Sequence, residues 1–482
     1  MAAAKARRVD LLAWSPIERA VRWRYARAVP QALLLALAAL VVYDGLTGPQ
    51  VAPLNFAGVL PWVVWRGLVV LSLVMVGNLF CLACPLPLAI GLGRRLGGGI
   101  AAWPAALRSK WLAAVVLLAF FWLYEALDVW ASPALTASVL LALFVAALAL
   151  GAIFRGAAFC KYLCPIGHFG YVCSTCSPFE VGAREASVCV RCVSKDCIAG
   201  TPRRGEGGVA SGRLGCQLWL FVPAKVGSLD CTYCLDCVGA CPHRNVGLLA
   251  RLPGAELQDV RRRSGIGRLS LRVDYGVLAV VVAAAGLVNA FGMTGGYWSL
   301  WEWARGGAGW LPEWLFVGLA LVGASVASGA FTWLAAWITA HAGQPSSLSE
   351  TWARYVWCLA PAALGMWCAH YMYHFLTGAG AVVPLSLQFA LSHGVDLGLA
   401  PDWSVGPLAP ASWLLPIQGL TLEMGALLAI ASAAGIARSA GLAGWRLAAG
   451  LTPWLTLIAI YVVLAALILM QPMEMRGTLA GG

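Results

Sequence analysis

The sequence predicts an all-α polytopic membrane protein, with about nine transmembrane helices and one polar domain inserted among them. The 482 residues are 61% hydrophobic and only 11% charged. Their mean hydropathy of +0.79 lies far above that of globular domains. Eight of the sixteen cysteines fall in one short polar stretch, between Cys189 and Cys241. These observations separate a lipid-embedded part of the chain from a cysteine-rich part.

Nine apolar stretches are each long enough to cross about 30 Å of hydrocarbon. They lie at about 29–47, 61–80, 111–130, 135–155, 275–295, 314–338, 355–376, 412–437 and 449–470. The predicted parts of the chain are a basic cytoplasmic N-terminal segment at 1–28, a four-helix membrane unit at 29–155, the polar domain at 156–272 and a five-helix membrane unit at 273–482.

The positions of lysine and arginine predict the orientation in a bacterial inner membrane. The first 28 residues carry seven basic side chains, and the loop after the second stretch carries four more. Such loops stay in the cytoplasm, so the N-terminus and, four spans later, the polar domain are predicted to be cytoplasmic. The first stretch lacks a cleavage site and is expected to remain as an anchor. The net charge of +12 reflects this asymmetry and anionic lipid, and does not indicate nucleic-acid binding.

The second half of the cysteine-rich stretch has the spacing of a bacterial ferredoxin. Cys231, Cys234, Cys237 and Cys241-Pro242 read C-x2-C-x2-C-x3-C-P, which places three thiolates on one cluster and a fourth on another. Structural zinc is the alternative, but zinc sites usually combine two C-x2-C pairs across a longer loop. The spacing therefore predicts a [4Fe–4S] cluster.

The first half is less regular. Cys189, Cys192 and Cys197 have no close fourth cysteine, because Thr201 precedes Pro202 where a Cys-Pro is expected. Cys216 is the obvious substitute. Spacing leaves open which cluster takes Cys216 and which takes Cys241. Together the eight residues predict a ferredoxin-like domain with two [4Fe–4S] clusters.

Two further cysteine pairs end the second and fourth apolar stretches on the cytoplasmic face. They are Cys81-x2-Cys84-Pro and Cys160-x3-Cys164-Pro, and they are predicted to lie at equal depth. Four thiolates there are expected to hold a third cluster or copper(I). The alternative is that they are inert small apolar residues, which is the preferred interpretation for Cys358 and Cys368. Two neighbours are either additional ligands or a reduced dithiol: Cys173 and Cys176.

These motifs resemble the NapH/NosR/CcoG-type membrane polyferredoxins over roughly residues 60–250. The resemblance rests on the Cys160–Pro165 segment at a helix end and on the two-cluster insertion that closes with Cys241-Pro242. It implies electron transfer from the quinone pool or the cytoplasm toward periplasmic reductases, or maturation of copper sites. The sequence departs from the pattern in the C-x2-C-P spacing of the first pair, the missing Cys-Pro after Cys197, and the long five-helix extension.

The C-terminal helices carry ionisable residues at apolar depth, where they are costly unless they pair or function. His370 and His374 are four residues apart, on one helical face near the outer end of their span. Glu423, Glu125 and Asp128 are predicted at a similar level, and together the five residues suggest a quinone site. Haem and simple interfacial anchoring are the alternatives. His168 and His243, each shortly after a Cys-Pro, are expected at the surface near the clusters.

The sequence thus predicts an integral membrane electron-transfer subunit of a respiratory-type complex. It would relay electrons between quinone, or a membrane-face redox centre, and two [4Fe–4S] clusters, and would act with other redox subunits rather than as a stand-alone enzyme. The alternative is a copper-handling or metallocentre-maturation factor that uses cluster-derived electrons. A transporter is disfavoured, because the apolar stretches contain few charges.

Overall fold

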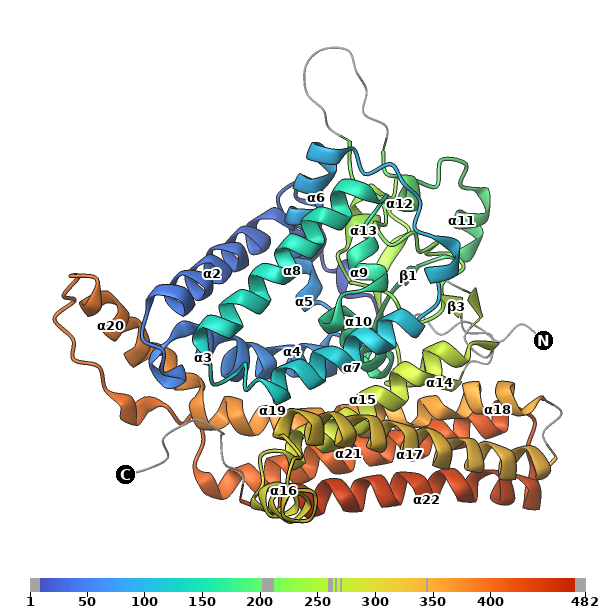
Figure 1. The fold of residues 1–482 in the computed structure, drawn as a ribbon. Coiled ribbons are helices and arrows are strands. Elements are labelled where there is room, and N and C mark those ends of the chain that lie inside the picture. Colours follow the sequence, from blue (N-terminus) through green and yellow to red (C-terminus); the bar gives the residue numbers. More distant parts are fainter. Residues whose placement is uncertain are drawn as a thin grey trace, which may run out of the picture.

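The computed structural model describes residues 9–201, 212–258, 263–264, 267–268, 271–343 and 346–472. It is mostly helical (Figure 1), and eight segments of this described part are long and apolar enough to span a membrane. They are Ala28–Thr47, Phe56–Met75, Pro133–Ile153, Val273–Phe291, Glu313–His341, Leu348–Ser392, Ala411–Ser439 and Gly444–Leu469. To this extent the predicted class, a helical chain with multiple candidate spans, is confirmed.

Two predicted spans differ in their ends. The second begins at Phe56 rather than near residue 61, because the side chain of Asn55 accepts a hydrogen bond from the Ala57 amide (2.8 Å) and caps the helix. The third is the shorter helix α7, Trp111–Ala126. It stops before residue 130 because Asp128 adopts φ +44°, which turns the chain.

The long C-terminal helices run side by side across the lower part of Figure 1. They are α15 (Val273–Phe291), α17 (Glu313–His341), α19 (Leu359–Gly378), α21 (Ala411–Ser439) and α22 (Gly444–Leu469). Helices α19 and α21 approach closely at two glycines: a Cβ on Gly425 would lie 3.0 Å from the Gly365 Cα. The flanking elements are α16 (Gly295–Ala308), α18 (Leu348–Tyr355) and α20 (Val382–Ser392).

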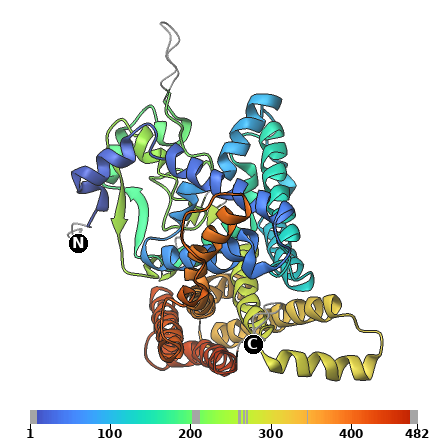
Figure 2. The same cartoon turned by 90° about the vertical axis from the view of Figure 1, so that its left-hand side faces the viewer.

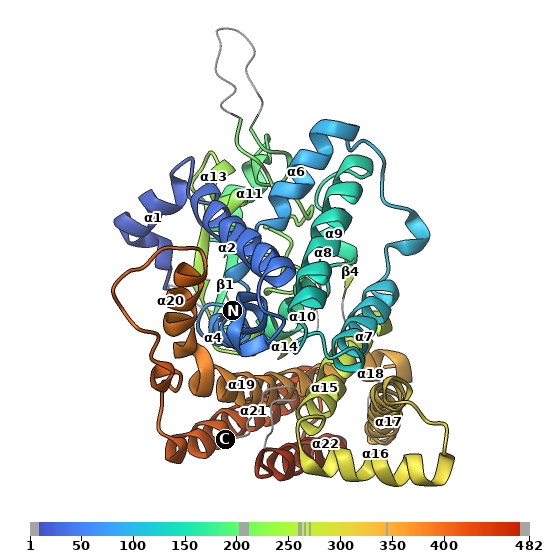
Figure 3. The same ribbon diagram turned by 60° about the vertical axis from the view of Figure 1, so that its left-hand side comes forward.

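The N-terminal helices form the upper part of the molecule. In Figures 1 and 3, α6 (Leu86–Gly97) lies along α8 (Pro133–Ile153), where Gly93 and Gly151 leave no room for a side chain. Helix α2 (Ala28–Thr47) also packs on α8. The span Phe56–Met75 combines three pieces, and a short helix follows it. These elements are α3 (Phe56–Val59), a π-helical turn (Leu60–Trp65), α4 (Arg66–Met75) and α5 (Phe80–Ala83).

The cysteine-rich region has little regular structure. Strands β1 (Phe179–Ala183) and β2 (Val246–Ala250) pair antiparallel, from Phe179 opposite Ala250 to Ala183 opposite Val246, and so bring the two ends of the region together. We refer to residues 179–250 as the cysteine lobe. Its helices and the neighbouring elements are short: α9 (Ala158–Tyr162), α10 (Pro165–Cys173), α11 (Ala186–Arg191), α12 (Asp196–Ala199), α13 (Asp236–Ala240), α14 (Ala255–Gln258), β3 (Arg263–Ser264) and β4 (Gly267–Arg268).

The N-terminal segment packs against the cysteine lobe, as Figure 2 shows. The carboxylate of Asp10 accepts hydrogen bonds from the Leu248 amide (3.1 Å) and from Arg184 (2.6 Å). After helix α1 (Ser15–Arg22), the guanidinium of Arg27 forms an ion pair with Asp236. The segment before the first span and the lobe are therefore one packed unit.

A buried polar network joins the lobe to helices α7, α9 and α10. The ammonium of Lys110 lies 2.7 Å from Asp230 and 3.1 Å from His168 Nε2, and it donates to the Lys161 carbonyl (2.9 Å). Lys110 and His168 have no exposed surface. The prediction that His168 lies at the surface is therefore wrong, because its ring satisfies buried partners on three sides. His243 is exposed, as expected.

Candidate metal centres

The eight cysteines of the lobe separate into two sets of four. Cys189, Cys192, Cys197 and Cys241 line one hollow, which we call the outer set. The inner set lines a second hollow and consists of Cys216, Cys231, Cys234 and Cys237. Each set takes three cysteines from one half of the lobe and its fourth from elsewhere, the exchange that two-cluster ferredoxins show. The structure thus places Cys241 with the outer set and Cys216 with the inner set.

Backbone geometry builds the two sets in the same way. Lys195 and Leu235 each stand two residues before a cysteine and adopt left-handed φ angles of +50° and +60°. Each then leads into a short helix, α12 or α13, which begins at the next residue with an aspartate. Because non-glycine residues rarely adopt positive φ, this repetition marks an imposed conformation at both sites. The two sites therefore share a repeated backbone conformation, which the different cysteine spacings do not reveal.

Hydrogen bonds to sulfur are already present around the thiols. The Asn245 side-chain amide donates to Cys189 Sγ (3.2 Å), and its backbone N–H donates to Cys241 Sγ (3.3 Å). The Leu220 amide donates to Cys216 Sγ (3.4 Å). Such N–H donors favour the thiolate form, and in iron–sulfur proteins they tune the reduction potential. Asn245 thus holds together two members of the outer set that are 52 residues apart in sequence.

A third group of thiols lies beside the inner set. Cys81, Cys84, Cys160 and Cys164 line one cavity of about 990 Å³, and Cys234 of the inner set lines it too. We call these four residues the membrane-face set. Pro85 and Pro165 each end the local turn directly after a cysteine, and the Gly167 amide donates to Cys164 Sγ (3.3 Å). Five arginines line the same cavity: Arg24, Arg27, Arg94, Arg95 and Arg213.

Burial in this cavity disfavours free thiolates. Burial, followed by the nearby Cys84, raises the pKa of the Cys164 thiol to about 12, so the thiol is protonated near neutral pH and a bound metal would have to displace that proton. In the outer set, burial and then Cys241 and Cys189 raise the pKa of Cys197 to about 11. Burial alone would lower the pKa of Arg27, but Cys234 and Asp236 reverse that effect and raise it. Arg27 therefore stands as a fixed positive charge between the inner and membrane-face sets.

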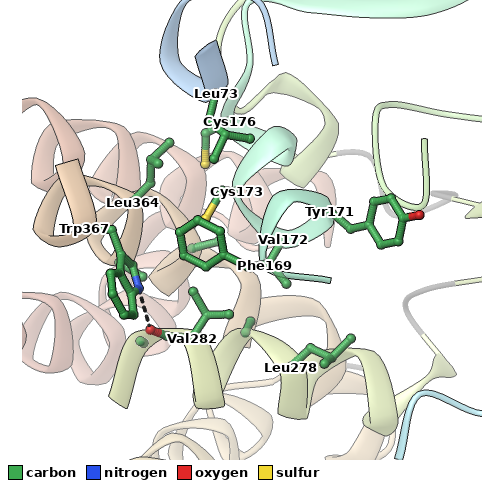
Figure 4. Packing of buried hydrophobic residues seen from close by; sticks show 14 of the residues in the cluster. Leu73, Phe169, Tyr171, Val172, Cys173, Cys176, Leu278, Val282, Leu364 and Trp367 are labelled. Carbon is green, nitrogen blue, oxygen red and sulfur yellow. Dashed lines mark hydrogen bonds between the residues drawn. The ribbon is translucent and has the colours of Figure 1, made fainter. Parts of the chain in front are cut away.

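Cys173 and Cys176 do not join these sets. Both are buried, and Figure 4 shows them packed among Leu73, Phe169 and Trp367. Neither lines the cavity of the membrane-face set. Their surroundings are those of apolar core residues, and Cys368 lies near them on α19. The structure thus separates this pair from both membrane-face pairs.

The five residues predicted for a quinone site are brought together only in part. His370 and His374 are buried with ring centroids 4.8 Å apart, and Glu125 accepts a hydrogen bond from Asn289. Asp128 is half-buried in the turn after α7. Glu423 is exposed on α21 and does not belong to this group. The sequence does not determine the direction in which this side chain points.

No family model, curated protein or solved structure matches the chain. Within the described ranges, no three His, Cys, Asp or Glu side chains take up the arrangement that holds a single metal ion. The donor chemistry of each cysteine set, four thiols with N–H groups directed at sulfur, is of the kind that an iron–sulfur cluster requires.

Three charged residues lie in telling positions that no sequence motif marks. In the sequence, Arg27 and Lys110 are two of the basic residues of predicted cytoplasmic loops. In the structure, Arg27 lines the cavity of the membrane-face thiols and Lys110 is fully buried. Arg66 is the one charged residue of the span Phe56–Met75. An ionisable side chain inside an apolar span is itself a signal of function, and it marks Arg66.

Proposed function

We propose that this chain is a multi-pass inner-membrane electron-transfer subunit that carries two [4Fe–4S] clusters, at the outer and inner cysteine sets. The observation that carries the proposal is the division of eight lobe cysteines into two interleaved sets of four. The NapH/NosR/CcoG-type polyferredoxins remain the family that the motifs resemble. In this proposal the lobe and the N-terminus face the cytoplasm, and other redox subunits complete the complex.

The order of the three sets supports a relay. The outer set is the more exposed, the inner set lies deeper, and Cys234 belongs both to the inner set and to the wall of the membrane-face cavity. When bound, each cluster supplies a one-electron step whose potential depends on N–H···S bonds and solvent exposure. The chain contributes thiolate ligands, the amide donors of Asn245 and Leu220, and the charge of Arg27.

A third centre at the membrane-face set extends the relay toward the bilayer. Four thiols in a cavity of about 990 Å³ leave far more room than one copper ion fills. A cluster is therefore the first choice for Cys81, Cys84, Cys160 and Cys164. Copper(I), which also prefers thiolates, is the second, and it corresponds to the metal-handling alternative.

Metal analysis of the purified membrane protein tests the proposal. Each cluster contributes about four iron and four sulfide, so two or three clusters predict about eight or twelve of each per chain. Cys241→Ser is expected to remove the paramagnetic signal of the outer cluster, and Cys216→Ser that of the inner cluster. Low-temperature electron paramagnetic resonance of the reduced protein distinguishes the two losses.

Cys358→Ala is the matched control, because Cys358 is buried away from all three sets and its loss should leave the iron content unchanged. Zinc without sulfide would contradict the proposal. Stoichiometric copper that disappears in Cys84→Ser and Cys164→Ser would favour the metal-handling alternative at the membrane-face set. Identical spectra for Cys216→Ser and Cys241→Ser would refute the assignment of the fourth ligands.

A further inference from the structure

A separate cavity of about 200 Å³ is lined by five segments that are distant in sequence. Its wall is largely aromatic and aliphatic, and it has no cysteine. The residues that matter for recognition are Trp62, Arg66, Trp130, His374 and Trp403. A small, mostly apolar hollow with few polar groups is the usual form of a site for a small organic ligand.

Two of its polar groups have no hydrogen-bond partner. Arg66 Nη2 is buried without an acceptor, and both ring nitrogens of His374 are buried without a partner. His374 is 2% exposed. Leaving such groups unsatisfied costs free energy, on the order of 1–3 kcal/mol each and more for a charged group. A ligand with two oxygen acceptors, one for Arg66 and one for His374, would satisfy both.

The surrounding structure fixes these two donors. The guanidinium carbon of Arg66 lies 4.2 Å, 5.0 Å and 4.8 Å from the ring centroids of Trp62, Tyr124 and Tyr371. Arg66 directly follows the π-helical turn Leu60–Trp65, a rare conformation found often at functional sites. Helices α4 and α19 also touch at Gly67, where a Cβ would meet the ring of Phe375, so the backbone positions next to Arg66 and His374 are held close together.

We propose that this cavity binds the ring of a quinone, with Arg66 and His374 donating hydrogen bonds to its two carbonyl oxygens. A flat, apolar ring with an acceptor at each end matches an indole-lined hollow with two unsatisfied donors. Haem fits less well, because it is larger than one ring and needs axial histidines from opposing helices, whereas His370 and His374 both lie on α19 and the third buried histidine of the described chain, His168, does not line this cavity. The inference rests on the proposed function, for which it names the membrane-soluble redox partner.

Equilibrium binding of decylubiquinone to the purified holoprotein tests this site. One quinone is expected to bind per chain. Arg66→Met and His374→Leu should each weaken binding about tenfold, because each removes one buried hydrogen bond from the complex. His374→Gln, which keeps a donor, should bind more tightly than His374→Leu. Ala381→Phe, which fills the cavity and leaves both donors in place, should abolish binding.

His341→Gln is the control, because His341 is exposed at the end of α17 and should not affect binding. A photoreactive azidoquinone should label the peptides around Trp62 or His374, as identified by mass spectrometry. Equal affinity in all variants, labelling elsewhere, or no binding to the wild-type protein would overturn the proposal. Elution volume on size exclusion shows whether each variant is folded.

Iron content and spin-resonance spectra of the same samples separate the two proposals. Absence of quinone binding with intact cluster signals would refute the quinone site but not the proposed electron relay. Quinone binding in a protein without iron would support the quinone site and refute the relay. Because binding is measured directly, neither outcome depends on turnover.

Discussion

Lys110 shows how a single buried charge can be accommodated where the cysteine lobe meets the membrane helices. Its three ammonium protons have three partners: Asp230, the carbonyl of Lys161 and Nε2 of His168. His168 Nδ1 lies 2.7 Å from the Cys164 carbonyl. The neutral ring can donate from Nδ1 and accept from Lys110 at Nε2, whereas a protonated ring would direct its Nε2–H at the Lys161 carbonyl (3.1 Å) and place its charge beside the Lys110 ammonium.

This network predicts acid sensitivity. Burial, followed by the charge of Lys110, lowers the pKa of His168 to about 3, whereas an unfolded histidine titrates near about 6.5. The unfolded state binds the extra proton between these values, so the stabilisation is complete above about pH 6.5 and is lost as the pH falls toward 3. Between these two pH values the free energy of unfolding is expected to fall by about 1.4 kcal/mol for each pH unit of acidification.

Thermal unfolding at pH 7.5 and pH 5 provides the measurement. We expect the melting temperature of the wild-type protein to fall at pH 5, and that of His168→Gln to change less between the two values. His243→Gln, at an exposed histidine, should behave as wild type. An equal pH effect in His168→Gln and wild type would show that His168 does not cause it.

Helix packing depends on glycines at the element scale. On α21, a Cβ at Gly425 would lie 2.7 Å from the Pro361 carbonyl oxygen of α19, which is a backbone atom that cannot rotate away. Gly419 of the same helix has nothing within 4 Å. The two positions differ only in what they face, so they form a matched pair.

Gly425→Ala is expected to destabilise the protein by about 1–3 kcal/mol, because α19 and α21 must separate to admit the methyl group. Gly419→Ala should leave stability unchanged or raise it slightly, since alanine is the better helix former. Differential scanning fluorimetry in detergent compares the two melting temperatures. Similar values for both variants would mean that the close contact contributes nothing.

The long helices could be predicted from sequence because apolar length alone defines them. The contacts between the cysteine lobe and these helices could not be predicted, because they depend on residues far apart in sequence. Nothing in the sequence around His168 reveals its buried partners. Lys110, 58 residues earlier, contacts the ring, and Asp230, 62 residues later, pairs with Lys110. The grouping of Cys216 and Cys241 with different sets was equally hidden, because spacing does not determine which hollow a cysteine lines. Glu423 is exposed, since position along a helix does not fix rotation about the helix axis.

At the scale of the whole molecule, the cysteine lobe contrasts with the helical bundle. In its described residues, 179–201 and 212–250, regular structure is limited to two five-residue strands and a few helical turns. Few backbone hydrogen bonds hold such a region, so bound metal would supply a large part of its stability, as in small metal-dependent domains.

Removing iron is therefore expected to expose the lobe to proteolysis while the bundle stays intact. Limited trypsin digestion of the protein, before and after treatment with an iron chelator under oxidising conditions, should give new cleavage within residues 179–250 only in the treated sample. Mass spectrometry locates the cuts, and the helices from Glu313 to Leu469 serve as the internal reference. Unchanged digestion rates would show that the lobe is stable without its metal.

The ion pair of Arg27 with Asp236 has a consequence for the path of the chain through the bilayer. Between Arg27 and Cys160 the structure has three helical spans and the shorter α7. Partners on one face require an even number of crossings, so in the proposed multi-pass topology α7 crosses as well. Its 16 residues reach only about 24 Å, less than the hydrocarbon thickness of about 30 Å. In that topology we expect the lipid around α7 to thin, which would make acyl-chain length a determinant of how well this protein is accommodated.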